Sequence, residues 1–317
     1  MYDRLKMYLI ASREGEFAAL PSLLNKAEQR INVQTGEVTT FGYMENIRVT
    51  IKPTSLFLDG SLAKYLYGGS NLYPLDRHTT KEAITSLSDA LHLNIEEANL
   101  SLIEFGYNFL MQYPPKEYLN LLGEMGNRQR YRFNTDSLYY RRRGKNQPDE
   151  WKIYNKVADA QRKKMEIPTP FVDANLLRAE ICLDKKIAKQ LRVTEAKAHC
   201  LYERDFYNSI KGKFLDYYFS ISKLQAISIE FSDEEITPRE GLFAILGYAL
   251  AMLDDGQEVI NRAIGQMKAE GRLRGKNDYA RLRQMATKAM CKAKRGEGNP
   301  LLRELDDCFL NLQANTS

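Results

Sequence analysis

The sequence predicts an α+β protein with an antiparallel sheet and packed helices, followed by a helical C-terminal part. Two observations support this class. Several segments before about residue 224 alternate apolar and polar side chains, as half-buried strands do, and are joined by turns or by stretches of helical spacing. Beyond that point, consecutive segments show helical spacing with Gly or polar breaks. We therefore expect two domains, residues 1–223 and residues 224–317.

The elements of the first part follow from local patterns. Apolar residues alternate in a strand at residues 3–10, and strands within residues 45–75 are interrupted at Pro53 and closed by the Gly68-Gly69 turn. Two threonines cap a helix at residues 79–93, and two prolines introduce another at 114–125. Strands are also expected at 99–111 and 175–185, and a hairpin at 136–156 with GKNQPD at its tip.

The C-terminal part is predicted to be helical and basic. Thr237 and Pro238 form an N-cap followed by a first-turn proline. Eleven Lys and Arg stand against two Asp and Glu in residues 262–295, and twelve against four in residues 126–164. Most such runs are solvated surfaces, but two of them in a chain with 19 tyrosines favour a polyanionic partner.

Composition also excludes several classes of protein. No apolar run is long enough to cross a membrane, and the first residues lack the blocks of a signal peptide. The four cysteines are widely spaced without a CxxC pair, which argues against a zinc cluster or disulfides and fits a reducing cytoplasm. With three scattered histidines, a bound metal is expected on carboxylates, which suits Mg²⁺ or Mn²⁺.

Three of the expected strands carry an apolar side and a polar side. Since strand neighbours alternate between faces, the polar sides would form one surface if these strands lie together in a sheet. The polar sides hold Glu104 with Asn108, Lys152 with Tyr154 and Lys156, and Arg178 with Glu180.

Such a surface suits phosphodiester transesterification. A tyrosine hydroxyl must lose its proton to attack, and a cation held by Glu104 and Glu180 would polarise the phosphate. Lys156 would lower the pKa of Tyr154 or stabilise the developing charge. Simpler interpretations remain open, because strand tyrosines commonly pack, acids are commonly solvated, and Arg178 with Glu180 would form an ordinary ion pair.

Four blocks of the sequence resemble the replication initiators of phages and plasmids typified by the filamentous-phage gene II endonuclease. In the order found in that family, they are SLAKYLYGGSNLYPL, LIEFGYNF, SLYYRRRGKNQPDEWKIYNK and LLRAEICLDKKIAKQL. The first corresponds to a strand, turn and G-N/S-N element, and the second to an R-I-D-x-x-x-x-F strand. The third ends in Y-x-K, and the fourth contains R-x-E. Together they span about residues 45–195.

The resemblance implies roles for particular residues. Tyr154 is then the residue that becomes linked to the 5′ phosphate of nicked DNA, with Lys156 as its companion. Glu104 and Glu180 take the acidic positions and look like metal ligands, and Arg178 is a phosphate or a structural partner. Leu102 stands where the family commonly has arginine. Like the family, the chain lacks the paired-histidine metal motif of other rolling-circle enzymes.

The resemblance also implies a fold and a function. The fold is the ferredoxin-like antiparallel sheet of rolling-circle initiators, with the site on one face and helices on the other. Residues 1–223 would nick and rejoin a DNA strand at a replication origin, with Mg²⁺ or Mn²⁺, and a host polymerase and helicase would act on the product. The C-terminal helices would bind the duplex origin or only pack on the catalytic domain. The expected DNA contacts are Arg141, Arg142, Arg143, Lys152 and Arg178.

Alternatives remain at this stage. Tyr139 and Tyr140 are rival nucleophiles, because one of them also lies on a strand face. A DNA-binding regulator of plasmid replication or copy number would keep the basic segments without needing Glu104 or Glu180. An RNA-binding or structural protein is compatible with the composition, but it would not explain acids and a tyrosine on the polar sides of three strands.

Overall fold

The computed structural model consists of two compact units, which are described separately. One comprises Met1–Lys223 with Glu304–Ser317, and the other Leu224–Arg303. The structure describes residues 1–73, 75–142, 148–223, 227–229, 237–251, 256–272, 275, 277–291, 293–295 and 299–314. Within them, no helix has the length and apolar character needed to cross a membrane.

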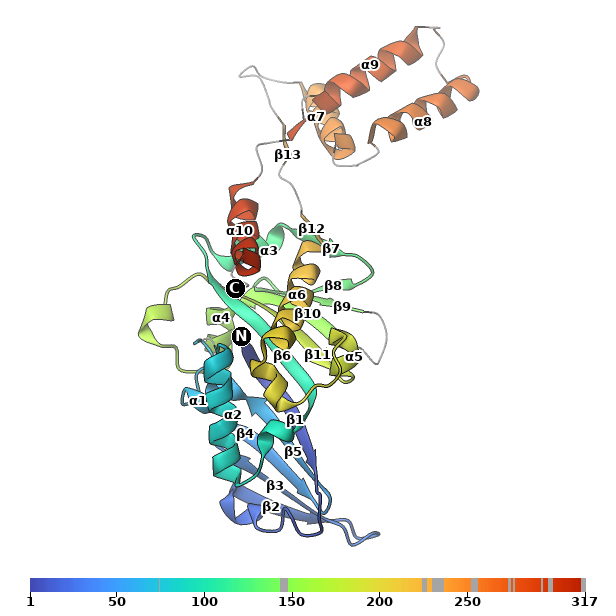
Figure 1. The fold of residues 1–317 in the computed structure, drawn as a ribbon. Coiled ribbons are helices and arrows are strands. Elements are labelled where there is room, and N and C mark those ends of the chain that lie inside the picture. Colours follow the sequence, from blue (N-terminus) through green and yellow to red (C-terminus); the bar gives the residue numbers. More distant parts are fainter. Residues whose placement is uncertain are drawn as a thin grey trace. The chain divides into compact units, whose positions relative to one another are not determined.

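A large antiparallel sheet forms the first unit (Figure 1). Its strand order is β2-β3-β4-β5-β1-β6-β11-β10-β9-β8, so the strands that carry the predicted polar residues lie side by side in its centre. The strands are β1 (Tyr2–Ile10), β2 (Asn25–Ile31), β3 (Val38–Met44), β4 (Ile47–Lys52), β5 (Ser55–Ser61), β6 (Asn99–Leu110), β8 (Gln129–Asn134), β9 (Ser137–Arg141), β10 (Asp149–Asn155) and β11 (Leu176–Asp184). The predicted α+β class with an antiparallel sheet is confirmed.

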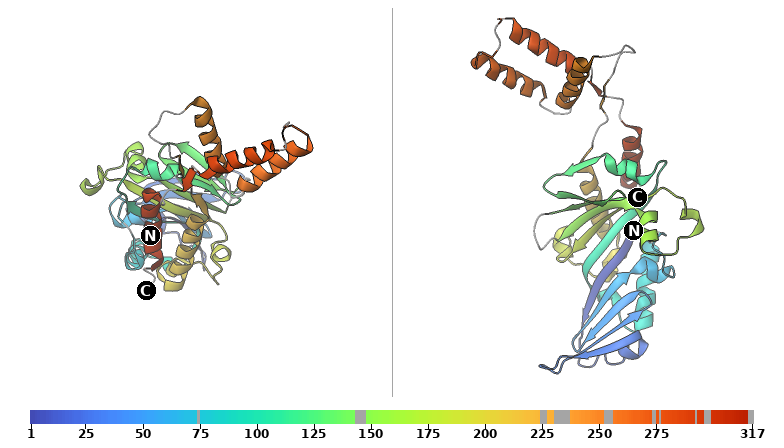
Figure 2. Two further views of the ribbon diagram at one scale, coloured as in Figure 1. Left: turned by 90° about the horizontal axis from the view of Figure 1, so that it is seen from above. Right: turned by 180° about the vertical axis from the view of Figure 1, so that it is seen from behind.

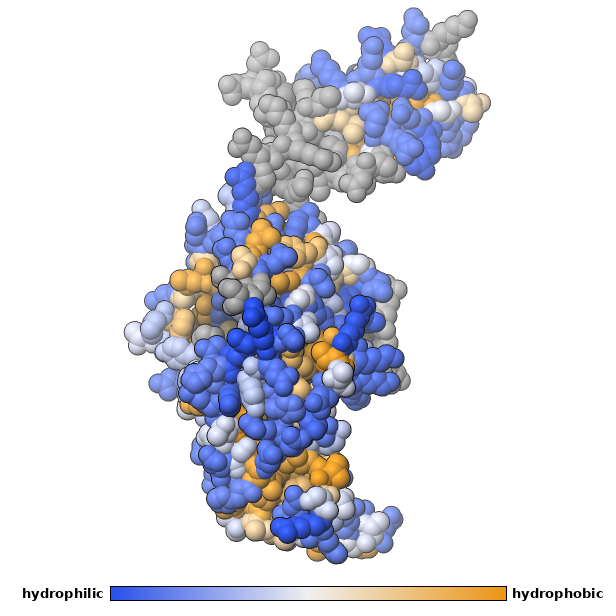
Figure 3. Space-filling model, in the orientation of Figure 1, coloured by the Kyte–Doolittle hydropathy of each residue, from blue (hydrophilic) through white to orange (hydrophobic). Residues whose placement is uncertain are grey.

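Helices cover one face of this sheet and leave much of the other open. Helices α2 (Arg77–Leu91) and α6 (Arg204–Phe219) lie in front of the strands in Figure 1, and the strands are in view from behind in Figure 2. The covered face is the core, where Ile103, Phe105, Trp151 and Ile181 are all fully buried. Burial of such side chains is the main stabilising contribution to folding. On the helical side the outer surface is largely hydrophilic, with apolar patches at the lower end of the sheet and near the top of the unit (Figure 3).

Shorter elements connect these strands. They are α1 (Leu62–Leu66), α3 (Pro115–Asn120), α4 (Lys156–Arg162), α5 (Ile187–Leu191), the 3-10 turns η1 (Leu20–Leu23), η2 (Ile95–Glu97), η3 (Thr169–Phe171) and η4 (Ala198–Tyr202), and the pair β7 (Leu122–Met125) and β12 (Ile221–Lys223). Gly68 and Gly69 have positive φ, as the predicted turn requires.

Three sequence-based boundaries are wrong. Residues 62–66 form a helix because the Ser61 hydroxyl accepts a hydrogen bond from the Lys64 amide and caps it. The helix predicted at 79–93 begins earlier, at Arg77, since the Asp76 side chain caps it. The helix predicted at 114–125 ends at Asn120, and residues 122–125 pair with β12 instead.

The last helix, α10 (Pro300–Ala314), differs from the expected division at residue 224, because its residues from Glu304 onward belong to the first unit. Phe309 is fully buried and stacks on Tyr218 with 3.5 Å between ring centroids. The Tyr218 hydroxyl donates to Asp306, and the Tyr118 hydroxyl donates to Glu304. Aromatic packing therefore returns the end of the chain to the sheet.

The second unit contains α7 (Pro238–Ala251), α8 (Gly256–Ala269), α9 (Asp278–Cys291) and a short ribbon of β13 (Ile227–Ile229) and β14 (Ala293–Arg295). Thr237 and Glu240 cap α7 reciprocally, which confirms the predicted start of this helix. A side chain at Gly247 would lie 2.4 Å from the backbone of Ala289, so this glycine allows α7 and α9 to approach closely.

Candidate active site

Strand register gathers the predicted polar residues on the open face of the sheet. In the β10–β11 pair, Lys152 lies opposite Glu180 and Tyr154 opposite Arg178. In the β11–β6 pair, Cys182 lies opposite Glu104. Residues directly opposite on neighbouring strands share a face, so the polar sides of the three strands form one surface.

Gly106 allows β6 and β11 to approach closely at this surface. It lies opposite Glu180 in the ladder. A Cβ at this position would lie 2.2 Å from the Ala179 carbonyl oxygen and 2.6 Å from the Glu180 Cβ. Any larger residue would therefore displace the Glu180 side chain.

Arg178 organises the cluster from its centre and has no exposed surface. Its Nε donates to Glu180 Oε2 at 2.6 Å and its Nη2 to Asp3 Oδ2 at 2.8 Å. Its Nη1 lies 3.3 Å from Asn108 Oδ1 and 3.4 Å from the Asn71 carbonyl oxygen. Because the guanidinium is bound on all sides by protein acceptors, the structure favours the structural of the two roles expected for it over a DNA contact.

Asp3 belongs to the cluster and was missed in the sequence. Besides Arg178, it accepts hydrogen bonds from the Ser61 hydroxyl and, at 2.7 Å, from the Asn71 side chain. Simple alternation places Asp3 on the apolar side of its strand, but the register of β1 shifts between Tyr2 and Leu5. An acid in an otherwise apolar strand was the available signal.

Tyr154 is nearly buried, with 7% of its surface exposed. Its hydroxyl donates to Glu180 Oε2 over 3.2 Å. Burial raises the pKa of Tyr154 well above its usual value, the Glu180 charge raises it further, and the Arg178 charge opposes this only in part. The phenol is therefore protonated in this state.

Lys152 joins the two acids that were predicted to bind a metal. Its Nζ lies 3.1 Å from Glu104 Oε1 and 3.0 Å from Glu180 Oε1. Burial alone would raise the pKa of Glu180, but Lys152 and Arg178 hold it well below its usual value. Burial followed by the Glu180 charge raises the pKa of Glu104. Lys152, expected to contact DNA, is instead held among carboxylates in this structure.

Lys156 is not part of the strand, as the sequence suggested, but is the first residue of α4. The Asn155 side chain accepts a hydrogen bond from the Ala158 amide and begins the helix there. Lys156 nevertheless lines the same cleft as Tyr154. It is 2% exposed, and burial, followed by the nearby Arg178 charge, lowers its pKa to about 8.

The cluster lies in a cleft of about 560 Å³. Among the described residues that line it, six are basic and four are acidic, and several of the basic ones come from elements other than the three central strands. The basic residues are Arg4, Arg48, Lys64, Lys152, Lys156 and Lys163, and the acidic ones Asp3, Asp59, Glu104 and Glu180. A net positive cleft that contains buried acids suits an anionic ligand and a bound cation together.

The rival tyrosines lie on opposite faces. Tyr139 lies opposite Lys152 and thus on the face of Tyr154, whereas Tyr140 is fully buried and donates to the Gly123 carbonyl. Arg141 pairs with Glu150, and its guanidinium lies 5.3 Å from the centre of the Tyr139 ring.

Two further predicted DNA contacts lie at the end of this hairpin. Arg142 is half exposed and pairs with Asp149 at 3.4 Å. Arg143 lies outside the described residues.

Comparison with known protein families identifies the chain. The model for the N-terminal part of the phage gene II replication-associated protein matches residues 1–201. The chain belongs to this family. The matched residues include the four blocks that carried the resemblance, and Ser61, Asn71, Glu104, Tyr154 and Glu180 from those blocks meet in the cleft of this replication-associated protein.

No curated protein sequence matches the chain. Among solved structures, it is similar to a rolling circle replication initiator protein from Geobacillus stearothermophilus, with 10% identity and a TM-score of 0.39 over 74% of this chain and 89% of that one.

Proposed function

We propose that this protein initiates rolling-circle replication by nicking one strand of its origin through Tyr154. The Tyr154 oxygen attacks the phosphorus, the bond from phosphorus to the 3′ oxygen breaks, and that oxygen leaves with a proton as a free 3′ hydroxyl. The 5′ phosphate stays on Tyr154 until a second transesterification rejoins the strand. The 3′ hydroxyl would serve a host polymerase, and a host helicase would open the duplex.

The observation that carries this proposal is the position of Tyr154. Its hydroxyl is hydrogen-bonded to Glu180, one of two acids that share the Lys152 ammonium, in a cleft whose lining is net basic. Family membership supports a role in replication. A strand residue that served only for packing would not need this charged surrounding.

Glu104 and Glu180 are the proposed ligands for a hard divalent cation. Their oxygens both lie about one hydrogen bond from the same Lys152 nitrogen, so both donors already surround one positively charged position. Carboxylate oxygens are the ligands that Mg²⁺ and Mn²⁺ prefer. A bound cation would take the place of the ammonium and supply charge stabilisation to the phosphate oxygens.

Lys156 is the proposed partner of Tyr154 in proton transfer. Its pKa of about 8 lies near neutrality, in the range that suits a group exchanging protons at physiological pH. In its charged form it also stabilises the phenolate. Glu180 is less suited to be the base, because its neighbours hold its pKa well below its usual value.

The open face next to the cleft is the proposed site for unpaired bases. Phe133 is 60% exposed, its ring contacts that of Tyr139, and Arg141 lies over both rings at 5.3 Å. On the other flank Tyr43 is 42% exposed and lies opposite Arg48. Aromatic and guanidinium faces stack on bases of any sequence.

The Tyr154→Phe variant tests the nicking proposal. With origin single-stranded DNA and Mg²⁺ or Mn²⁺, we expect cleavage to fall to background, because the attacking oxygen is gone, while DNA binding stays within about twofold. Gel-based cleavage and fluorescence anisotropy measure the two. The matched control Tyr139→Phe removes a hydroxyl from the same sheet face and should cleave normally.

A Tyr154→Phe protein that cleaves as well as the wild type would refute the role of Tyr154. A wild-type protein that binds origin DNA but does not cleave it with either metal would favour the alternative, a non-catalytic regulator of plasmid replication.

Phe133→Ala tests the base-stacking surface. We expect single-stranded origin DNA to bind more weakly by about 1–3 kcal/mol, the usual contribution of one stacked base. Phe219→Ala is the control, because Phe219 is also exposed but lies on α6. Equal affinities of the two variants, measured by anisotropy at one salt concentration, would place the bases elsewhere.

A further inference from the structure

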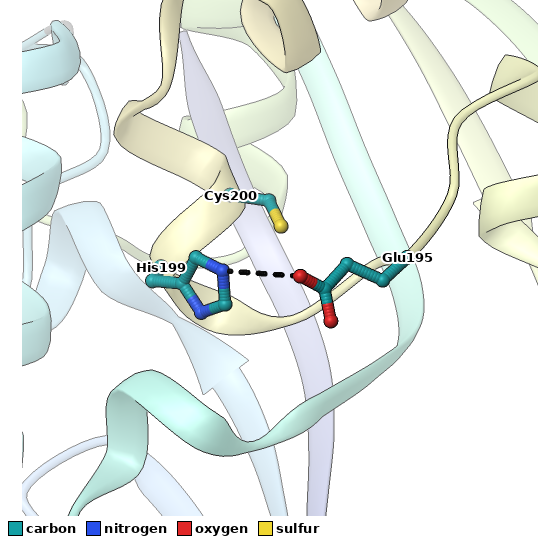
Figure 4. A group of neighbouring side chains, drawn as sticks. All are labelled: Glu195, His199 and Cys200. Atoms are coloured by element: carbon teal, nitrogen blue, oxygen red, sulfur yellow. Dashed lines mark ion pairs between the residues drawn. The ribbon is translucent and has the colours of Figure 1, made fainter.

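A second group of potential metal ligands lies outside the cleft. Glu195, His199 and Cys200 each offer one ligand atom, and these atoms all lie within 4.8 Å of one another. His199 and Cys200 belong to η4, and Glu195 to the loop before it. Figure 4 shows the imidazole and the carboxylate facing each other, with the Cys200 sulfur near the gap between them. None of the three lines the cleft that contains Tyr154.

The hydrogen bonding of His199 leaves one ring nitrogen suited to bind a metal. Its Nδ1 lies 3.2 Å from the Glu96 carbonyl oxygen. A carbonyl can only accept, so Nδ1 carries the proton and Nε2 keeps its lone pair. This arrangement, with the other ring nitrogen held by a carbonyl, is the usual support of a metal-binding histidine.

The surroundings of Nε2 match a coordination site better than a hydrogen-bonded pair. Nε2 lies 3.6 Å from Glu195 Oε1 and 3.7 Å from Glu203 Oε1, beyond normal hydrogen-bond length. Ligands about 2.0–2.3 Å from a tetrahedral zinc ion are separated by about 3.3–3.8 Å. The spacing found here is therefore the spacing of ligands around an ion.

The remaining contacts leave these ligand atoms accessible. Lys197 pairs with Glu97 at 2.8 Å and with the other oxygen of Glu195 at 3.5 Å, which leaves Oε1 facing the histidine. His199 Nδ1 also lies 4.0 Å from Glu97. The Cys200 side chain is buried beneath, with the residue 3% exposed, while the carboxylates are open to solvent. An ion can enter from that side.

We propose that Glu195, His199 and Cys200 bind a zinc ion, with Glu203 or water in the fourth position. A thiol, an imidazole and a carboxylate form the mixed donor set that suits Zn²⁺, unlike the all-carboxylate pair at Glu104 and Glu180. On binding, the Cys200 thiol releases its proton to solvent. The ion fastens the segment before α6 to η2 and the start of β6, where Ala198 bonds to Ala98.

Cobalt titration of the full-length protein tests this site. After treatment with a chelator, we expect one equivalent of Co²⁺ to produce a thiolate-to-cobalt charge-transfer band and the visible bands of a tetrahedral site, and Zn²⁺ to displace it. Cys200→Ser should abolish the charge-transfer band. His199→Gln should weaken Co²⁺ binding at least tenfold, since a ligand is lost. Cys308→Ser, which removes a thiol in α10, should leave the band unchanged.

Failure to bind a stoichiometric ion, or an unchanged band in Cys200→Ser, would overturn the proposal. His199 is partly exposed, so His199→Gln keeps the test valid if Cys200→Ser does not fold. The site shares no ligand with the Tyr154 cleft, and its outcome is therefore independent of whether the protein nicks DNA.

Discussion

The two faces of the central strands differ in what stabilises them. On the covered face Trp151 is fully buried among aromatic rings, with centroid distances of 5.9 Å to Tyr140 and 6.3 Å to Phe214. On the open face the next residue, Lys152, is held by charge alone. Adjacent residues on one strand thus contribute to a hydrophobic core and to an ionic cluster.

The difference has an energetic consequence. An apolar contact contributes roughly in proportion to the area it buries, so losing one leaves the others intact. A buried ionic cluster is stable only while each charge is compensated, because an unpaired buried charge is costly. The open face therefore holds reactive groups at a cost in free energy that the covered face offsets.

Arg178→Met should have the largest effect. It removes the partner of both Asp3 and Glu180 and leaves two buried carboxylates without their main cation. We expect the free energy of unfolding to fall by about 3–5 kcal/mol, as for other broken buried pairs, and nicking to be lost. Urea unfolding followed by circular dichroism measures the first.

The control is Arg142→Met, whose side chain is 52% exposed and whose ion pair should contribute about 0–1 kcal/mol. An Arg178→Met protein within 1 kcal/mol of the wild type would mean that the cluster does not depend on its central charge.

Trp151→Ala should destabilise by a similar or slightly smaller amount but leave the chemistry intact. Removing the ring creates a cavity that costs about 3–5 kcal/mol. Because Trp151 points away from Tyr154, cleavage per folded molecule should stay within severalfold of the wild type. If the alanine variant does not fold, Trp151→Phe gives a milder version. Normal stability with lost cleavage would show that the two faces are not separate in function.

Lys156→Met should have a smaller effect, and one that depends on pH. The Lys156 pKa is about 8 in the folded protein and near 10.5 when unfolded, so the unfolded chain binds more protons between these values. The stability contributed by this group is full above about pH 10.5 and is lost as the pH falls to about 8. The wild type should thus gain about 3 kcal/mol over this window relative to Lys156→Met. Parallel pH profiles of the two proteins would refute the low pKa.

Strand periodicity was sufficient to predict much of the cluster. Alternation alone places Glu104, Tyr154 and Glu180 on polar sides, and an antiparallel sheet brings such sides together. The register that sets Lys152 between the two acids depends on strand order, which local patterns do not contain. Lys152 was therefore predicted to face DNA.

Other features depended on local irregularities. Asp3 reaches the cluster through the register shift in β1, and Lys156 through a helix that an asparagine cap starts in the middle of the Y-x-K motif. The ligands around His199 were missed because they follow neither CxxC nor paired-histidine spacing and are grouped instead by a 3-10 turn.

Peptide mapping of the covalent product tests the central claim most directly. The purified protein would be incubated with single-stranded origin DNA and Mg²⁺ or Mn²⁺, denatured, digested and analysed by mass spectrometry. The account predicts a 5′-phosphorylated nucleotide on the peptide that contains Tyr154. Attachment to the peptide of Tyr139 and Tyr140, or no adduct on DNA that the protein demonstrably binds, would contradict it.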